Sequence, residues 1–305
     1  MDTETVNQSA VPARFYPQAI VNITNRCNLH CSHCFVYRDG NPNQPVSEPS
    51  DDDLLAQIRE IRDRHRIGAM LWMGGEPLIK KDLLRRGLPL FARNTITTNG
   101  TIPLADFSDV TENLLYVISL DGPEALNDSI RGEGVFRRVM DNMGRLPSGF
   151  PHVVQCQCVV TRRNQDSLPE FVEIISRSPF RHLTFSFHVP ARNDTTGNAW
   201  ESVRQRDDAI RLVMELKKQM GGLIRNRTRS LEMMLSENNP GKITGNCPAK
   251  QLILPLYLSG RTLVSPFCCY GNDVDCDRCG AWVVFEMAAA LENPAVAARQ
   301  LHLPD

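Results

Sequence analysis

Apolar stretches of strand length alternate with amphipathic stretches of helical length along the first two-thirds of the chain. This alternation constrains the fold more than any other feature of the sequence. The predicted strands span residues 19–24, 69–73, 94–98, 115–120, 153–160 and 183–189. The predicted helices span residues 51–66, 80–91, 135–143, 168–176 and 201–220. Six strand-led units in a row predict a parallel sheet with right-handed crossovers.

The number of units favours a partial barrel. A full eight-unit barrel usually needs about 250 residues, and the repeating pattern covers only about 200. We therefore expect an α/β fold, a partial (β/α)6 TIM-like barrel. From about Leu231 the pattern changes, and two short apolar stretches around Ser259-Gly260 predict a β-hairpin. The expected organisation is a flexible N-terminal tail (1–16), the barrel (17–230) and a small cysteine-rich appendage (231–305) that holds the hairpin and a terminal helix over 281–300.

Charge and hydropathy exclude several classes of protein. The chain has 34 Lys and Arg against 35 Asp and Glu, which gives no reason to expect a nucleic-acid groove or a membrane-surface patch. No apolar run approaches the roughly 20 residues that span a bilayer. The polar segment 1–14 lacks the apolar core of a signal peptide. We therefore expect a cytoplasmic protein.

Cysteine is unusually frequent for a chain with no export signal. The ten cysteines occupy positions 27, 31, 34, 156, 158, 247, 268, 269, 276 and 279. Structural disulfides are rare in a reducing cytoplasm, so clustered cysteines there indicate metal or redox chemistry. Three cysteines near the start and five near the end predict two sites. Cys156 and Cys158, on one predicted strand, are expected to be small packing residues.

The first group, Cys27, Cys31 and Cys34, has C-x3-C-x2-C spacing on a loop after the first predicted strand. Thiolates favour zinc or iron–sulfur clusters. A structural zinc site is closed by four ligands, and His30 or His33 could supply the fourth, so zinc remains an alternative. Three cysteines on a four-iron cluster would instead leave one iron open to an exogenous ligand.

Polar and glycine-rich motifs follow the later strands, at the edge where α/β folds place their sites. They are Gly74-Gly75-Glu76-Pro77, Thr97-Thr98-Asn99-Gly100, Ser119-Leu120-Asp121-Gly122-Pro123 and Cys158-Val159-Val160-Thr161, with Arg131 ten residues after Asp121. Glycine lets a ligand approach the backbone closely. Glu76 can accept hydrogen bonds from an ammonium group, and the guanidinium of Arg131 suits a carboxylate.

Together these motifs resemble the radical S-adenosylmethionine (radical SAM) enzymes, over nearly the whole chain. The resemblance implies that Cys27, Cys31 and Cys34 bind a [4Fe-4S] cluster whose open iron chelates S-adenosylmethionine. It also implies that the reduced cluster splits this cofactor into a 5′-deoxyadenosyl radical that abstracts hydrogen from a substrate. The cofactor-binding residues that it implies are Gly74, Gly75, Glu76, Thr98, Asn99, Ser119, Asp121, Arg131 and Val160. His33 stands where the family often has an aromatic residue.

The C-terminal cysteines resemble the SPASM/twitch appendage of one branch of this family, which carries auxiliary iron–sulfur clusters. The chain supplies enough cysteines for one such [4Fe-4S] cluster, so the twitch version is the closer match. The resemblance implies Cys247, Cys268, Cys276 and Cys279 as ligands, with Cys269 as a spare. A structural zinc held by the same four thiolates is the alternative.

The motif set favours a radical enzyme over a zinc-binding scaffold, which would need only the cysteines. Because the barrel begins near Pro17 and leaves no room for a peptide-recognition domain, we expect a small-molecule substrate such as a sugar, aminocyclitol or nucleoside. Peptide modification and addition of the radical to an alkene remain alternatives. A flavodoxin or ferredoxin-like protein is the expected electron donor. The positions expected to meet substrate are Tyr37, His188, Arg192, Asn193 and Tyr270.

Overall fold

The structure is a computed structural model, and it describes residues 14–37 and 47–293. Most of the predicted N-terminal tail and the last part of the predicted terminal helix lie outside these ranges. None of the helices in the two ranges is both long and apolar enough to cross a membrane.

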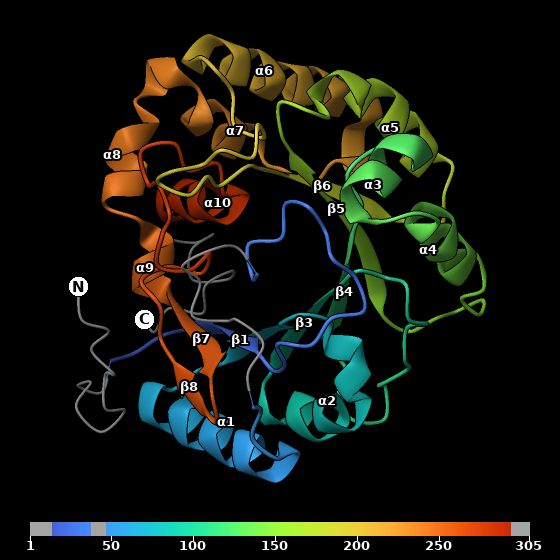
Figure 1. The fold of residues 1–305 in the computed structure, drawn as a ribbon, viewed down its shortest axis with the longest axis vertical. Coiled ribbons are helices and arrows are strands. Elements are labelled where there is room, and N and C mark those ends of the chain that lie inside the picture. Colours follow the sequence, from blue (N-terminus) through green and yellow to red (C-terminus); the bar gives the residue numbers. More distant parts are fainter. Residues whose placement is uncertain (1–13, 38–46, 294–305) are drawn as a thin grey trace.

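One eight-stranded sheet forms the centre of the fold, with the strand order β6-β5-β4-β3-β2-β1-β7-β8 (Figure 1). Strands β1 to β6 and β7 run parallel, and β8 is antiparallel to β7. The strands are β1 (Gln18–Asn22), β2 (Ala69–Met73), β3 (Arg93–Thr98), β4 (Leu114–Ser119), β5 (Val153–Val160), β6 (His182–Phe187), β7 (Ile253–Ser259) and β8 (Thr262–Val264). The predicted α/β fold with six parallel strand-led units is confirmed.

Helices line the outer side of the curved sheet and connect its successive parallel strands, except β3 and β4, whose connecting residues 99–113 contain no helix (Figure 1). They are α1 (Asp51–His65), α2 (Lys81–Gly87), α3 (Glu124–Arg131), α4 (Val135–Gly144), α5 (Leu168–Ser176) and α6 (Val203–Met220). Four further helices lie in the C-terminal part, α7 (Thr228–Met234), α8 (Pro240–Gly245), α9 (Pro248–Leu252) and α10 (Trp282–Leu291). The sequence analysis did not predict α3, α7, α8 or α9, and it extended α2 too far.

The predicted hairpin consists of β7 and β8, which are joined through Ser259 to Thr262. Gly260 lies in this turn with φ of +58°, a value that glycine adopts without strain. β7 also pairs in parallel with β1, with Ile20 opposite Pro255. The hairpin therefore continues the barrel sheet past its first strand.

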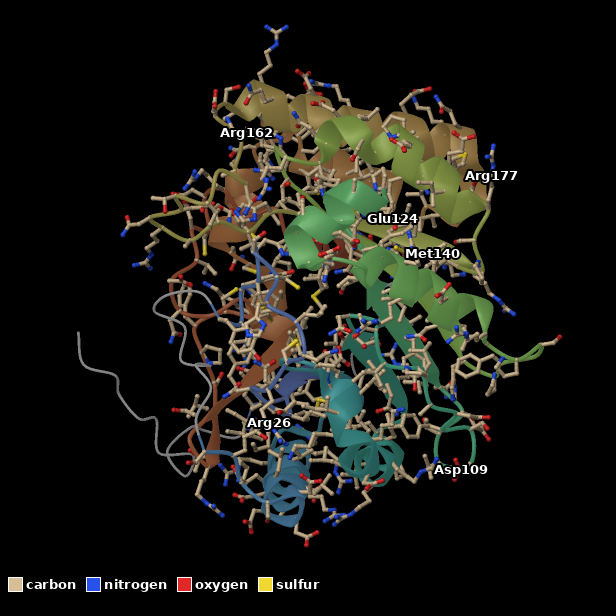
Figure 2. The ribbon with its side chains drawn as sticks, turned by 45° about the vertical axis from the view of Figure 1, so that its right-hand side comes forward. Arg26, Asp109, Glu124, Met140, Arg162 and Arg177 are labelled. Atoms are coloured by element: carbon tan, nitrogen blue, oxygen red, sulfur yellow. The ribbon has the colours of Figure 1, made fainter. Side chains whose placement is uncertain are left out.

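The core lies between the sheet and the helices. Its largest fully buried side chains include Trp72, Tyr116 and Phe171. Cys156 and Cys158 are also completely buried, as expected for packing residues. Exposed charged side chains surround this core, and Figure 2 shows Asp109 and Arg177 on the outside of the molecule.

Candidate active site

The first three cysteines lie together on the loop that follows β1, at the carboxyl edge of the parallel strands. The amide of Cys34 donates to the carbonyl of Cys31 at 3.1 Å. The Sγ atom of Cys27 accepts hydrogen bonds from the amide of Leu29 at 3.4 Å and from Asn99 Nδ2 at 3.9 Å. Burial raises the pKa of Cys31 to about 11, and the nearby Arg131 opposes that rise. The loop thus gathers three thiols beside a guanidinium.

Glu48 anchors the start of the cysteine loop. Its Oε1 atom accepts hydrogen bonds from Thr24 Oγ1 at 2.6 Å and from the amide of Asn25 at 2.8 Å. Its other carboxylate oxygen lies 3.6 Å from Lys80 Nζ. The Tyr37 hydroxyl donates to the carbonyl of Asn25. Glu48 belongs to no motif, and its role depends on a contact across more than 20 residues, so the sequence carried no signal for it.

The loop after β2 packs against the backbone of the cysteine loop. The amides of Gly75 and Glu76 donate to the carbonyls of Thr24 and Arg26 at 2.8 and 2.9 Å. A Cβ atom at Gly75 would collide with the carbonyl oxygen of Arg26. Gly74 has φ of +143° and faces the backbone of Thr24. The two glycines therefore allow the cysteine loop to approach.

Replacing Gly75 by alanine should displace the cysteine loop. Because the new methyl group meets backbone, which cannot rotate away, we expect a loss of about 1–3 kcal/mol in stability and a lower iron content. Urea unfolding and iron analysis of purified protein measure both effects. Gly144→Ala is the matched control, because a Cβ there meets nothing within 4 Å. Equal behaviour of the two variants would contradict the close-approach argument.

Glu76 is completely buried and links the loops after β2 and β3. Its Oε1 atom accepts from the amide of Leu78 at 2.9 Å and from Thr98 Oγ1 at 2.7 Å, and Oε2 accepts from the amide of Asn99 at 2.9 Å. Burial raises its pKa, and these hydrogen bonds oppose the rise. Asn99 continues the chain of contacts to Asn28 in the cysteine loop at 2.9 Å. The structure thus brings together Glu76, Thr98 and Asn99.

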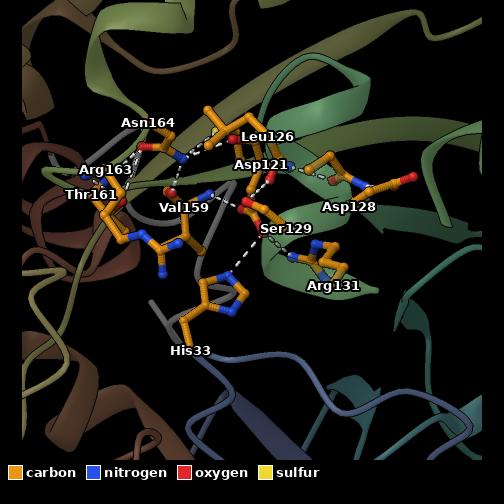
Figure 3. A network of polar contacts seen from close by, with 12 residues as sticks. His33, Asp121, Leu126, Asp128, Ser129, Arg131, Val159, Thr161, Arg163 and Asn164 are labelled. Atoms are coloured by element: carbon orange, nitrogen blue, oxygen red, sulfur yellow. Dashed lines mark hydrogen bonds and ion pairs between the residues drawn. The ribbon is translucent and has the colours of Figure 1, made fainter. Parts of the chain in front are cut away.

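Asp121 is the centre of a second polar network at the end of β4 (Figure 3). Its completely buried carboxylate lies 2.7 Å from Arg131 Nη2 and 2.9 Å from His33 Nε2, and it accepts from the amide of Val159 at 3.0 Å. Burial alone would raise the pKa of Asp121, but Arg131 and His33 hold it well below its ordinary value. The motifs predicted Asp121 and Arg131 as site residues, but no local pattern indicated their pairing with each other or the pairing of Asp121 with His33.

Two nitrogens of this network, Arg131 Nε and His33 Nδ1, are buried without a hydrogen-bond partner among the described residues. Arg131 Nε is a donor, whereas His33 Nδ1 donates or accepts according to the tautomer and charge of the ring. A buried polar atom without a partner is unfavourable, and the guanidinium fork suits a carboxylate. The network therefore fits the carboxylate of an amino-acid ligand beside Cys31. Ser119 is half-buried and Val160 completely buried at the neighbouring strand ends.

The C-terminal cysteines line one cavity of about 170 Å³. The cavity is bounded by all five of them, Cys247, Cys268, Cys269, Cys276 and Cys279. Burial raises the pKa of Cys279 to about 12, and the thiols of Cys268, Cys247 and Cys276 add to the rise, which shows that the four lie close together. Cys269 lines the same cavity as the other four cysteines. The geometry therefore does not distinguish it as the cysteine that is not a ligand.

The size of this cavity bears on what its thiols can hold. A buried water needs only about 10–15 Å³ on the same measure, and four thiolates around one zinc ion lie about 2.3 Å from it. The cavity volume is more than ten times the volume that one buried water needs, so the cavity fits a polynuclear cluster better than a single metal ion. In the described part of the chain, no three His, Cys, Asp or Glu side chains are grouped closely enough to hold a metal ion.

The two cysteine groups are in contact through aromatic rings. Phe35, next to Cys34, lies against Tyr270, next to Cys269, with ring centroids 5.0 Å apart. Tyr270 also hydrogen-bonds Ser186 at the end of β6. The expected substrate residue Tyr270 therefore lies between the two groups of thiols.

The loop after β6 joins the same region. His188 is buried, and its Nε2 atom lies 2.8 Å from Asp194 Oδ2. The side chains of Arg192 and Asn193 are exposed, while the amide of Arg192 donates to the carbonyl of Asp273 at 2.8 Å. This loop thus packs against the segment that carries the last cysteines. Of the three residues predicted here to contact substrate, only His188 is buried, and Arg192 and Asn193 are exposed.

A partial parallel barrel with three loop thiols and a carboxylate-sized donor set at its carboxyl edge defines the class of iron–sulfur enzymes that use S-adenosylmethionine. The family model of the Radical SAM superfamily matches residues 21–175, just over half of the chain. The chain belongs to this superfamily, as its motifs predicted. It is therefore an enzyme whose cofactors are a cysteine-bound [4Fe-4S] cluster and S-adenosylmethionine, as membership of this superfamily implies.

Curated proteins and solved structures agree with this assignment. Pre-heme d1 synthase of Dinoroseobacter shibae is 31% identical over 168 residues, which cover 52% of this chain and 40% of that protein. GTP 3′,8-cyclase of Limosilactobacillus fermentum is 24% identical over 87% of this chain and 75% of its own length. Streptococcus suis SuiB bound to its precursor peptide SuiA has a TM-score of 0.61 at 16% identity, covering 85% of this chain and 63% of SuiB. The chain spans about half the length of the first curated relatives that it matches.

Proposed function

We propose that this enzyme reductively cleaves S-adenosylmethionine and uses the resulting 5′-deoxyadenosyl radical to abstract hydrogen from a small-molecule substrate. The observation that carries the proposal is the buried, unpartnered Arg131 Nε donor beside the three loop cysteines. Its guanidinium matches the carboxylate of that cofactor in charge and hydrogen-bonding capacity. A flavodoxin or ferredoxin-like protein would supply the electron.

Cys27, Cys31 and Cys34 would hold the cluster, which when bound supplies the electron that splits the sulfonium. In this proposal Arg131 orients the cofactor carboxylate, and Asp121 fixes the guanidinium through the 2.7 Å ion pair. Asp121 therefore acts through Arg131, because its oxygens already serve donors of the protein. We assign the ribose to Ser119, the adenine to Val160, and the cofactor ammonium to the loop of Gly74, Gly75 and Glu76 with its Thr98 and Asn99 partners.

Cys247, Cys268, Cys276 and Cys279 would hold an auxiliary [4Fe-4S] cluster in the larger cavity. The volume of that cavity and the proximity of the four thiols support this assignment. The ring contact between Phe35 and Tyr270 would place the auxiliary cluster beside the substrate space. Held by these four thiolates, a cluster would supply a redox group or a binding group next to the substrate.

A small-molecule substrate is supported by the relatives named as a GTP cyclase and a pre-heme synthase. Peptide maturation is the second candidate. It is favoured by the similarity in fold to SuiB, which was solved with its precursor peptide, and by relatives named mycofactocin maturase. His188, Tyr270 and Arg192 are the residues that we propose for substrate contact.

The test is to count metals and to follow cofactor cleavage in one anaerobically reconstituted sample. We expect about eight irons and eight sulfides per chain, from two four-iron clusters, and release of 5′-deoxyadenosine after reduction by dithionite. About four irons with one zinc would make the appendage a structural site and overturn the auxiliary cluster. Zinc at both sites without cleavage would overturn the proposed function itself.

A further inference from the structure

A second cavity, of about 90 Å³, lies between the end of β6 and the start of α6. Its walls come from three segments far apart in the sequence. His188 follows β6, Trp200 and Ser202 precede α6, and Arg206 and Arg278 complete the wall from α6 and from the C-terminal cysteine segment. Because it opens at the carboxyl end of β6, the cavity lies on the same edge of the barrel as the cysteine loop.

Arg206 lines this cavity and forms no ion pair with a carboxylate among the described residues, although Cys279 and Asp207 lie within its electrostatic reach. Its Nη2 atom donates to the carbonyl of Cys279 at 3.2 Å, while its Nε atom is buried without a hydrogen-bond partner. The adjacent carboxylate of Asp207 accepts a hydrogen bond from the amide of Ser236 at 3.1 Å, on the side of α7. A buried donor without a partner is unfavourable unless a ligand or a water molecule matches it.

The other walls also favour an anion. Arg278 lies 2.7 Å from Asp275 at the mouth of the cavity, which leaves most of its guanidinium donors for a ligand. The 18-residue helix α6 begins here, with Ser202 as its N-cap, and a helix N-terminus carries partial positive charge. One carboxylate, that of exposed Asp277, lines the cavity. Pro190, Ala199 and the Trp200 ring add apolar surface.

We propose that this cavity binds an anionic oxygen group of the substrate, a carboxylate or a phosphate, with Arg206 as its principal ligand. The inference rests on the proposed function, because it takes the molecule bound here to be the radical's substrate. His188, held by Asp194 at 2.8 Å, then faces the part of the substrate next to the anionic group. The enzyme would select acidic metabolites over neutral ones of the same size.

The test is binding of inorganic phosphate and of acetate to the reconstituted protein, measured by calorimetry without reductant. We expect one of the two anions to bind at a single site. Arg206→Gln should lower the affinity for this anion at least about tenfold. Arg204→Gln, on the same helix but exposed, should bind like the unaltered protein. Tighter phosphate binding would identify a phosphate ester, and tighter acetate binding a carboxylic acid.

Arg278→Gln keeps the inference testable if Arg206→Gln fails to fold, because its side chain is half-exposed. We expect this variant to lower the affinity for the same anion by about threefold or more. Absence of anion binding, or unchanged binding in Arg278→Gln and in any folded Arg206→Gln, would overturn the proposed subsite. Since no cofactor cleavage is involved, that outcome leaves the proposed radical chemistry untouched, and iron analysis of each variant shows whether the clusters are retained.

Discussion

Replacing Cys31 by alanine should remove about four irons per chain and reduce cleavage of S-adenosylmethionine to the background rate. Cys31 lies within the electrostatic reach of both Cys27 and Cys34 and of Arg131. Its loss would leave two cysteines, too few to hold the cluster, and would remove the thiol beside the guanidinium of Arg131. Iron and sulfide analysis together with chromatography of 5′-deoxyadenosine measures the two effects in one preparation.

Cys276→Ala is the matched control for this variant. It removes one thiol from the larger cavity, on the far side of the Phe35–Tyr270 contact. We expect it to lose a similar amount of iron but to keep reductive cleavage of the cofactor. If Cys31→Ala retained all its iron, or if Cys276→Ala alone stopped cleavage, the assignment of the two cysteine groups to their roles would be wrong.

Replacing Asp121 by asparagine should destabilise the protein by about 3–5 kcal/mol, the usual cost of breaking a buried ion pair by removing one partner. Asp121 is completely buried, and its carboxylate faces both Arg131 and His33. The variant keeps the shape of the side chain but leaves the buried guanidinium uncompensated. Because Arg131 then loses its fixed orientation, binding of S-adenosylmethionine should weaken as well.

The pH dependence of unfolding separates this ion pair from simple packing. Since the folded pKa of Asp121 lies below its ordinary value of about 3.9, its stabilisation is fully present above that pH. It is lost as the pH falls toward the depressed pKa. Asp121→Asn should lack this part of the acid dependence.

Glu124→Gln is the control for Asp121→Asn. Glu124 lies on α3, the helix that carries Arg131, but on its exposed side (Figure 2), where it pairs with Arg137 at 3.2 Å. An exposed pair of this kind contributes at most about 1 kcal/mol. Urea unfolding at neutral and acid pH measures both variants. Equal losses for the two would show that the buried network contributes no special stability.

Local patterns were enough to predict most of the barrel. Strands β2 and β5 begin and end at the residues predicted from the sequence. Both signals used for them, the spacing of apolar residues and the turn residues at strand ends, depend only on neighbouring positions in the chain. Prediction failed where a helix was short. α2 ends at Gly87, and the next turn, which contains Pro89, is a 3-10 helix, while α7 to α9 are too short to show a clear period.

The sequence by itself indicated the fold class through its alternating pattern and the superfamily through the resemblance of its motifs, and it predicted two groups of thiols from the clustering of cysteines. Only the tertiary structure decided that β7 continues the sheet beside β1. It also decided that Asp121 pairs with Arg131 and His33, and that Arg206 lines a cavity without an ion pair to a carboxylate among the described residues. Each of these contacts joins segments far apart in the chain, where partner choice depends on packing and burial of charge and no local pattern records it.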